Sequence, residues 1–216
     1  DFDSAVRAGV RAVMTNSGQS CNAPTRMLVP RDKIDEVAAI AQTETTSLTV
    51  GDPLQNPDIG PVVSRNQYEK IQALIQSGID AGATLVAGGI GLPEGLTHGF
   101  YVRPTVFAHV DNAMTIARDE IFGPVLVIIG YDSIDDAIAT ANDSPYGIAG
   151  YIQGRDATTI QRVTRSLRVG QVVINQATPE PLAPFGGYKQ SGNGREWGEF
   201  AFEAYLEIKA VLGMPD

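Results

Sequence analysis

Apolar residues recur along the chain with two different periods, and the period changes from one segment to the next. Spacings of three and four residues predict amphipathic helices, whereas short apolar runs bounded by glycine or proline predict strands. The predicted helices cover residues 3–14, 32–41, 64–79, 133–141 and 156–167, with a short one over 197–202. The predicted strands cover residues 26–30, 84–87, 101–110, 124–130, 147–152, 171–175 and 205–211.

This order of elements indicates the fold class. The run 124–130 is apolar at successive positions, so we expect both faces of that strand to be covered. Strands that alternate with helices of about ten to fifteen residues are typical of a layered α/β domain. We therefore expect one α/β domain over residues 1–216, built as three layers (αβα) with a largely parallel sheet.

Local signals refine the ends of these elements. Asp32 is expected to cap the second helix, and Ser64 and Gln67 have the spacing of a capping box that opens the third. The segment 205–212 alternates like a strand but has no following helix to cover it. We expect it to be a terminal strand used in oligomerisation.

Composition and charge then exclude several classes of partner. The 216 residues are 43% hydrophobic, and 16 Lys and Arg against 25 Asp and Glu give a net charge of −9. Such an acidic chain offers no basic field for nucleic acid or for an anionic membrane surface, so neither is expected as a partner. No apolar run is longer than 125–129, which is far shorter than the roughly 20 residues of a spanning helix.

The first residues of the chain and the cysteine count bear on the expected location of the protein. The chain begins without Met and without the basic region of a signal peptide, so we expect a cytoplasmic location and a piece cut from a longer chain. Cys21 is the one cysteine, which excludes an internal disulfide framework and a structural zinc site based on cysteine. No metal site is expected.

Cys21 is also the first candidate for chemistry. A lone cysteine is more often a small buried apolar residue than a nucleophile. Its neighbours 16–22 are polar and contain glycine, which predicts a loop, and catalytic groups are concentrated on loops held by rigid elements. An exposed thiol there is a candidate nucleophile, with its own backbone N–H available for an oxyanion.

Other candidate groups are weaker when the residues are read alone. A Cys-His hydrolase is an alternative, but His98 and His109 lie in contexts that do not suggest pairing with Cys21. No dinucleotide or P-loop fingerprint is present. By default Glu120 is a solvated strand end, and Phe122 and Phe185 belong to the core.

Three segments together nevertheless resemble one family. Asn16-Ser-Gly-Gln-Ser-Cys21, followed by an Arg-bearing strand, resembles the catalytic-cysteine signature of the aldehyde dehydrogenase superfamily. Glu120-Ile-Phe-Gly-Pro124 is similar to the cofactor-contact motif of that family, and residues 184–196 to its glycine-rich C-terminal motif. The likeness runs through the whole chain, including residues 59–61 and 142–147.

The resemblance implies a mechanism and roles for the site residues. Cys21 would attack an aldehyde to give a thiohemiacetal, and loss of hydride to NAD or NADP would leave a thioester that water hydrolyses to the carboxylic acid. Glu120 would accept hydrogen bonds from the hydroxyls of the nicotinamide ribose, and Phe122 would face the nicotinamide. Phe185 would line the substrate tunnel. The family also implies a homodimer or homotetramer.

Parts of the family pattern that the mechanism requires are missing from the sequence. The upstream glutamate that serves as general base, the asparagine of the oxyanion site and the N-terminal dinucleotide-binding domain are absent from the 216 residues. We therefore expect this catalytic-domain fragment to be inactive alone. Two alternatives stay open, a CoA-acylating or phosphorylating aldehyde dehydrogenase and a non-catalytic oligomerisation module.

Overall fold

The computed structural model describes residues 2–178 and 180–213, and its helices and strands alternate as the apolar pattern predicts. The helices are α1 (Phe2–Met14), α2 (Ile34–Thr46), α3 (Arg65–Asp80), α4 (Thr115–Arg118), α5 (Ile134–Asn142) and α6 (Ala157–Ser166). The strands are β1 (Arg26–Pro30), β2 (Thr84–Ala87), β3 (Thr105–Ala108), β4 (Val125–Tyr131), β5 (Ala149–Ile152) and β6 (Gln171–Ile174). Short 3-10 segments include η1 (Thr15–Gly18) and η5 (Glu199–Tyr205).

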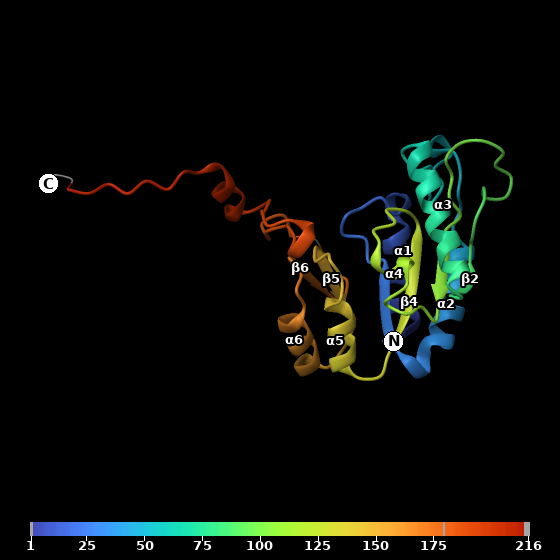
Figure 1. Cartoon of the computed structure of the whole chain (residues 1–216), viewed down its shortest axis with the longest axis horizontal. Coiled ribbons are helices and arrows are strands. Elements are labelled where there is room, and N and C mark those ends of the chain that lie inside the picture. Colours follow the sequence, from blue (N-terminus) through green and yellow to red (C-terminus); the bar gives the residue numbers. More distant parts are fainter. Residues whose placement is uncertain (1, 179, 214–216) are drawn as a thin grey trace.

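The strands form two sheets that lie side by side (Figure 1). The larger sheet has the order β1-β4-β3-β2, in which β4 pairs in parallel with both β1 and β3, and β2 is an antiparallel edge. Strands β5 and β6 pair in parallel as a second, two-stranded sheet. The expected α/β fold with a largely parallel sheet is confirmed.

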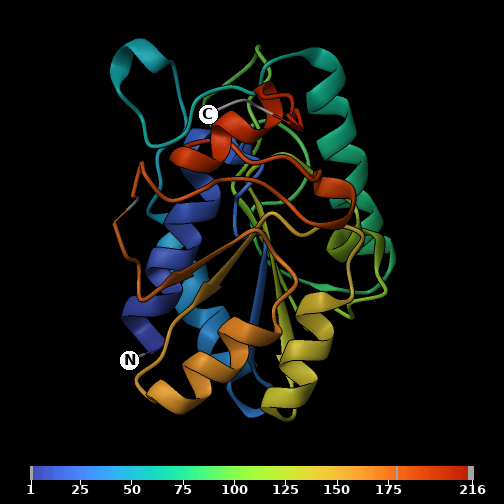
Figure 2. The ribbon, with the colours of Figure 1, turned by 90° about the vertical axis from the view of Figure 1, so that its left-hand side faces the viewer.

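Strand β4 shows why the larger sheet has helices on both faces. Its side chains alternate, so that Leu126 and Ile128 enter one core with α1 and α2, whereas Val125, Val127 and Ile129 enter a second core with α3 and α4. All five residues are at most 4% exposed. Figure 2 shows α1 and α3 on opposite sides of the strands. These are the three layers that the doubly apolar run predicts.

The helix starts confirm some of the cap predictions and correct others. Ser64 accepts a hydrogen bond from the backbone N–H of Gln67 at 3.2 Å, as a cap should. The Gln67 side chain does not complete the capping box, because it donates to carbonyls of a distant loop instead. Asp32 is not a cap either. It lies inside the 3-10 turn Arg31–Lys33, and α2 begins at Ile34 without a side-chain cap.

Two predicted elements differ in extent or type. The strand predicted over 101–110 is only Thr105–Ala108, because Pro104 lacks the N–H that would extend the ladder. The helix predicted over 197–202 is the 3-10 segment Glu199–Tyr205. Short α4 was not predicted at all, since four residues carry no measurable period.

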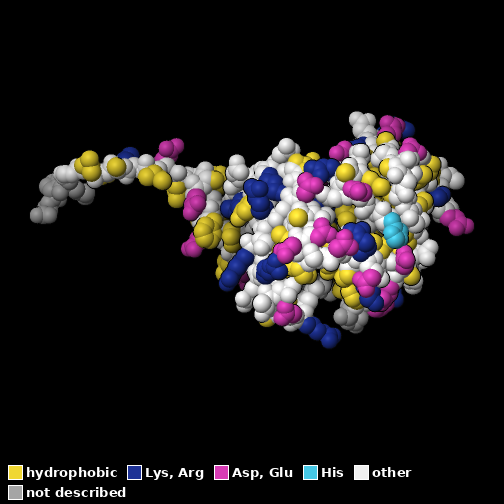
Figure 3. Space-filling view, turned by 60° about the horizontal axis from the view of Figure 1, so that its bottom comes forward, with side chains coloured by type: hydrophobic (Ala, Val, Ile, Leu, Met, Phe, Trp, Pro, Cys, Tyr) yellow, Lys and Arg dark blue, Asp and Glu magenta, His cyan; other side chains and the backbone are white. Residues whose placement is uncertain are grey.

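The terminal strand predicted over 205–212 is not a strand in the single chain. Residues 206–213 have no regular structure and extend away from the body (Figure 1), because no sheet edge of the same chain pairs with them. Tyr205, Ile208 and Leu212 are each at least 87% exposed, and Figure 3 shows apolar side chains along this tail. Its use in oligomerisation stays a prediction.

Candidate active site

Cys21 lies at the tip of a tight turn between α1 and β1. The N–H of Ala23 donates to the carbonyl of Ser20 at 3.1 Å, which closes the turn and leaves Cys21 and Asn22 as its two central residues. The Cys21 thiol is exposed. The structure therefore places this cysteine on a loop, as its polar neighbours predict.

The chain reaches this turn through three successive residues with left-handed backbone angles. The φ values are 53° at Asn16, 57° at Ser17 and 71° at Gly18. For a residue with a side chain this conformation costs roughly 1–2 kcal/mol. Asn16 offsets part of that cost, since its amide donates to the carbonyl of Gln19 at 2.9 Å. Such a strained approach persists only where the surroundings hold it.

The segment 59–63 supplies one set of these surroundings. The buried hydroxyl of Ser17 donates to the carbonyl of Gly60 at 2.9 Å. The backbone N–H of Val63 donates to the side-chain oxygen of Gln19, also at 2.9 Å. Residues 59–61 are one of the segments that carry the family resemblance, and here they brace the approach to Cys21.

The second support is the loop 120–124. A Cβ atom placed on Gly18 would lie 2.0 Å from the carbonyl oxygen of Gly123 and 2.6 Å from the nitrogen of Pro124. The two backbones are therefore in direct contact, and only glycine fits at position 18. The cysteine loop and the loop with Glu120 and Phe122 are brought together by this approach.

Helix α3 fixes the 120–124 loop from the other side. The amide of Gln67 donates to the carbonyls of Ile121 and Phe122 at 2.9 and 2.8 Å, and Lys70 donates to the carbonyl of Glu120 at 2.7 Å. Phe122 has a left-handed φ of 55° and is half-buried. The Glu120 side chain is exposed, so its carboxylate is available to a ligand.

Strand β5 contacts the cysteine turn from the second sheet. The hydroxyl of Tyr151 donates to the carbonyl of Asn22 at 2.7 Å. Burial raises the pKa of Tyr151, and negative charge on Cys21 raises that pKa further. Tyr151 is therefore bonded to the turn that carries the thiol.

Arg26 ties the strand that follows the cysteine to the same region. Its guanidinium donates to the side chain of Asn112 at 2.7 Å and to the carbonyls of Thr140 and Ala141 at 3.0 and 2.8 Å. Those carbonyls belong to the last turn of α5, where a cation is favoured. The arginine of the resembling motif thus joins β1 to the start of the 142–147 segment.

The glycine-rich segment 184–196 packs on residues 142–147. Lys189 donates to the carbonyls of Asn142 and Ser144 at 2.7 and 3.0 Å, and the Ser191 hydroxyl accepts from the N–H of Gly147 at 3.0 Å. Phe185 exchanges two backbone hydrogen bonds with Glu196, and its ring centroid lies 5.1 Å from that of Trp197. Within residues 2–178 and 180–213, no hydrogen bond joins Phe185 to Cys21.

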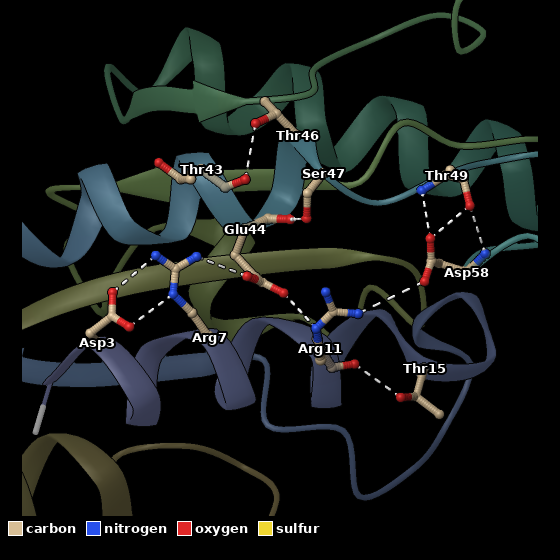
Figure 4. Close-up of polar contacts among 10 residues, drawn as sticks. All are labelled: Asp3, Arg7, Arg11, Thr15, Thr43, Glu44, Thr46, Ser47, Thr49 and Asp58. Atoms are coloured by element: carbon tan, nitrogen blue, oxygen red, sulfur yellow. Dashed lines mark hydrogen bonds and ion pairs between the residues drawn. The ribbon is translucent and has the colours of Figure 1, made fainter.

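An ion-pair network locks the helix that leads to the cysteine (Figure 4). The buried carboxylate of Glu44 on α2 pairs with Arg7 at 3.0 Å and with Arg11 at 2.5 Å, both on α1. Arg7 also binds Asp3, and Arg11 reaches Asp58 at 3.8 Å. Since Asp58 directly precedes the segment 59–63, the network links α1 to the brace that holds Ser17.

The histidine alternative finds no support in the geometry. His109 pairs with Asp35 at 2.9 Å, and His98 lies against Thr97. Neither ring is hydrogen-bonded to Cys21 among the described residues. The described part of the chain also holds no group of three or more His, Cys, Asp and Glu placed to bind a metal ion.

Two surface hollows lie away from the predicted site residues. One of about 200 Å³ is beside the ion-pair network, and one of about 470 Å³ lies between the end of α2 and residues 87–104. Cys21, Glu120, Phe122 and Phe185 line neither of them.

None of the helices described is both long and apolar enough to cross a membrane.

Several residues that shape the site were missed when the sequence was read alone. The sequence pattern predicts a helix-cap role for Gln67 and indicates no role for Lys70 or Tyr151. Their contacts join segments between 50 and 129 positions apart. No local pattern carries such information.

The fold and these motifs define a member of one family. The family model described as "Aldehyde dehydrogenase family" matches residues 1–211. The chain belongs to the aldehyde dehydrogenase family.

Among the relatives, a 3-succinoylsemialdehyde-pyridine dehydrogenase from Pseudomonas sp. is 51% identical over 99% of this chain, which covers 45% of that protein. Among solved structures, a cysteine-to-alanine variant of aldehyde dehydrogenase C from Pseudomonas syringae, with NAD⁺ and octanal, is 50% identical with a TM-score of 0.96. An aldehyde dehydrogenase from Mycobacterium tuberculosis with NAD⁺ is 46% identical with a TM-score of 0.94. The two matches cover 98% and 100% of this chain, respectively, and 44% of the chain in each solved structure. It thus spans less than half the length of these relatives.

Proposed function

We propose that residues 1–216 are the catalytic domain of an NAD(P)-dependent aldehyde dehydrogenase, with Cys21 as its nucleophile. The observation that carries this proposal is the contact of Gly18 with Gly123 and Pro124. It joins the loop of the exposed thiol to the loop of Glu120 and Phe122. A nucleophile and a cofactor-contact loop must be neighbours for hydride transfer, and this backbone contact supports both assignments.

The residues of the site then have distinct roles. The Cys21 sulfur bonds to the aldehyde carbon, and the carbonyl oxygen becomes an oxyanion that the Cys21 backbone N–H stabilises. A bound NAD(P) would supply the hydride acceptor, and the thiohemiacetal on Cys21 would become a thioester when it loses that hydride. Water then breaks the carbon–sulfur bond of the thioester, which releases the carboxylic acid and returns the thiol.

Glu120 and Phe122 fit the cofactor that this chemistry needs. The exposed carboxylate of Glu120 has two oxygens to accept hydrogen bonds from the two hydroxyls of a ribose. The backbone of Phe122, two residues further on, is held by the amide of Gln67, and its half-buried ring is proposed to face the nicotinamide. Phe185 is assigned to the substrate tunnel. The NAD⁺ in the two similar structures favours NAD over NADP for this chain.

The chain by itself is expected to be inactive, because the general base, the second oxyanion donor and most of the cofactor site lie outside it. We therefore expect no aldehyde-dependent formation of NADH from the 216 residues alone. The complete enzyme is proposed to be a cytoplasmic homodimer or homotetramer, with residues 205–212 as the strand that pairs with a neighbouring subunit. Turnover by the isolated chain would contradict this expectation.

Two alternatives differ in a way that can be observed. A CoA-acylating or phosphorylating enzyme would pass the thioester to an acceptor other than water, and an upstream region without the base glutamate would favour it. A non-catalytic oligomerisation module would need the tail but no reactive thiol. The strained and braced approach to Cys21 favours the catalytic proposal over this second alternative.

Alkylation of Cys21 tests the nucleophile assignment directly. Because the chain has one cysteine, incorporation of iodoacetamide reports on that thiol alone. We expect the folded chain at neutral pH to react faster than the same chain unfolded in urea, where the thiol is an ordinary one. Equal rates in the two states would overturn the assignment.

A further inference from the structure

Tyr151 has no part in the mechanism above, yet it bonds to the turn that carries the nucleophile. It lies on β5 in the two-stranded sheet, 130 positions from Cys21 along the chain. The hydroxyl donates to the carbonyl of Asn22, the second central residue of the turn, at 2.7 Å. That length is near the optimum for a bond from a hydroxyl to an oxygen.

The peptide unit between Asn22 and Ala23 is consequently held at both of its polar atoms. Its N–H donates to the carbonyl of Ser20 and closes the turn at 3.1 Å, while its C=O accepts from Tyr151. The Ser20 hydroxyl adds a third bond within the turn, to the side chain of Asn22 at 2.9 Å. Of these three bonds, only the one from Tyr151 reaches outside the turn.

We infer that Tyr151 is a positioning residue, which fixes the Asn22–Ala23 peptide and with it the orientation of the Cys21 turn. This inference rests on the proposed role of Cys21. With the bond in place, the negative end of the Asn22 carbonyl dipole is directed to the hydroxyl of β5. Without it, only the Ala23 N–H still holds that peptide unit, and a shift of the carbonyl toward the sulfur would disfavour the thiolate.

The ionisation of Tyr151 is compatible with this role. Its pKa is raised by burial and then by the charge of Cys21, which favours the protonated hydroxyl. The hydroxyl therefore keeps the proton that it donates to the carbonyl of Asn22.

The test compares two tyrosine-to-phenylalanine variants in the 216-residue chain. Tyr151→Phe keeps the ring and removes the donor. Tyr146→Phe is the matched control, since Tyr146 is 37% exposed against 38% for Tyr151 and its hydroxyl makes no hydrogen bond among the described residues. The measured quantity is the rate of Cys21 alkylation by iodoacetamide as a function of pH, with urea unfolding curves to show that each variant folds.

We expect Tyr151→Phe to move the pH midpoint of alkylation upward by about half a unit, which lowers the rate below the midpoint about threefold. Tyr146→Phe should leave the profile of the original chain unchanged. An unchanged or lowered midpoint in Tyr151→Phe, or an equal rise in both variants, would overturn the inference.

The outcome also separates this inference from the proposed function. If the original chain reacts faster when folded but Tyr151→Phe matches it, the nucleophile stands and the role of Tyr151 fails. If the original chain reacts no faster when folded than when unfolded, the nucleophile assignment itself fails.

Discussion

The α-carbon of Gly18 lies so close to the carbonyl of Gly123 that a methyl group on it would come within 2.0 Å of that oxygen. Two loops that are more than 100 positions apart in the sequence meet here without any side chain between them. One carries Cys21 and the other carries Glu120 and Phe122. The geometry of the proposed site therefore depends on a backbone contact.

Replacing Gly18 by alanine should destabilise the chain by about 3 kcal/mol. About 1–2 kcal/mol comes from a φ of 71°, and the clash with Gly123 adds a further amount of similar size. Gly82→Ala is the matched control, because Gly82 has a φ of 84° but nothing within 4 Å of its added methyl group. Urea unfolding measures both variants. Equal losses would show that only the backbone angle matters and that the two loops are not in contact.

Gln67→Glu should loosen the 120–124 loop. The substitution keeps the shape of the side chain but removes the N–H groups that reach Ile121 and Phe122, which leaves two carbonyls without their donor. We expect a loss of about 2 kcal/mol in the free energy of unfolding. Gln76→Glu on the same helix, next to Asp80 at the surface, should cost only about 0.5 kcal/mol. If Gln67→Glu lost no more stability than Gln76→Glu, the 120–124 loop would keep its conformation without the two hydrogen bonds from Gln67.

Glu44→Gln should weaken the packing of α1 on α2. The carboxylate is 6% exposed and faces two guanidinium groups, so its neutralisation leaves those charges with one acceptor fewer. Because both arginines are partly exposed, we expect a loss of about 2 kcal/mol, less than for a fully buried pair. Asp3→Asn, which removes a carboxylate that is 56% exposed, should have a much smaller effect. Thermal unfolding measures the loss of stability in both variants. Equal losses would contradict the prediction that the buried carboxylate contributes more than the exposed one.

Asp58 predicts an acid-sensitive part of the stability. Hydrogen bonds from the Thr49 hydroxyl and N–H, at 2.7 and 2.8 Å, hold the pKa of Asp58 below its ordinary value of 3.8. A lowered pKa in the folded state contributes stability above about pH 4, and that contribution is lost as the pH falls through the folded pKa. Asp58→Asn should thus be less stable than the original chain at pH 7, and the difference should shrink as the pH falls below about 4, as urea unfolding at each pH can show. A constant difference at all pH values would contradict this assignment.

The fold was predictable because its signals are local. The doubly apolar run 124–130 predicts a strand with helices on both faces, and β4 is that strand. Ser64, Ser133 and Asp156 mark the helix starts that the structure shows. Asp32 failed as a cap because the chain inserts a 3-10 turn before α2, a choice that the cap residue alone does not determine.

The site was predictable only in part, because its remaining contacts are not local. Cys21 was placed correctly on a loop, since polar and glycine residues surround it. Gln67 has the spacing of a helix cap, yet its amide is used 54 positions away. Tyr151 lies on a strand whose residues predict only packing, and its bond to Asn22 exists only once the two sheets are placed side by side. The strand predicted over residues 205–212 would likewise need a partner strand from another chain.

The central claim is that Cys21 is the nucleophile of an aldehyde dehydrogenase. It can be tested by joining the upstream part of the 50% identical aldehyde dehydrogenase C of Pseudomonas syringae, whose structure holds NAD⁺ and octanal, to this chain and measuring the NADH formed from these two compounds. We predict aldehyde-dependent NADH formation by this chimera and only background in its Cys21→Ala variant, with equal urea unfolding curves for the two. Undiminished NADH formation in the Cys21→Ala variant would contradict the account.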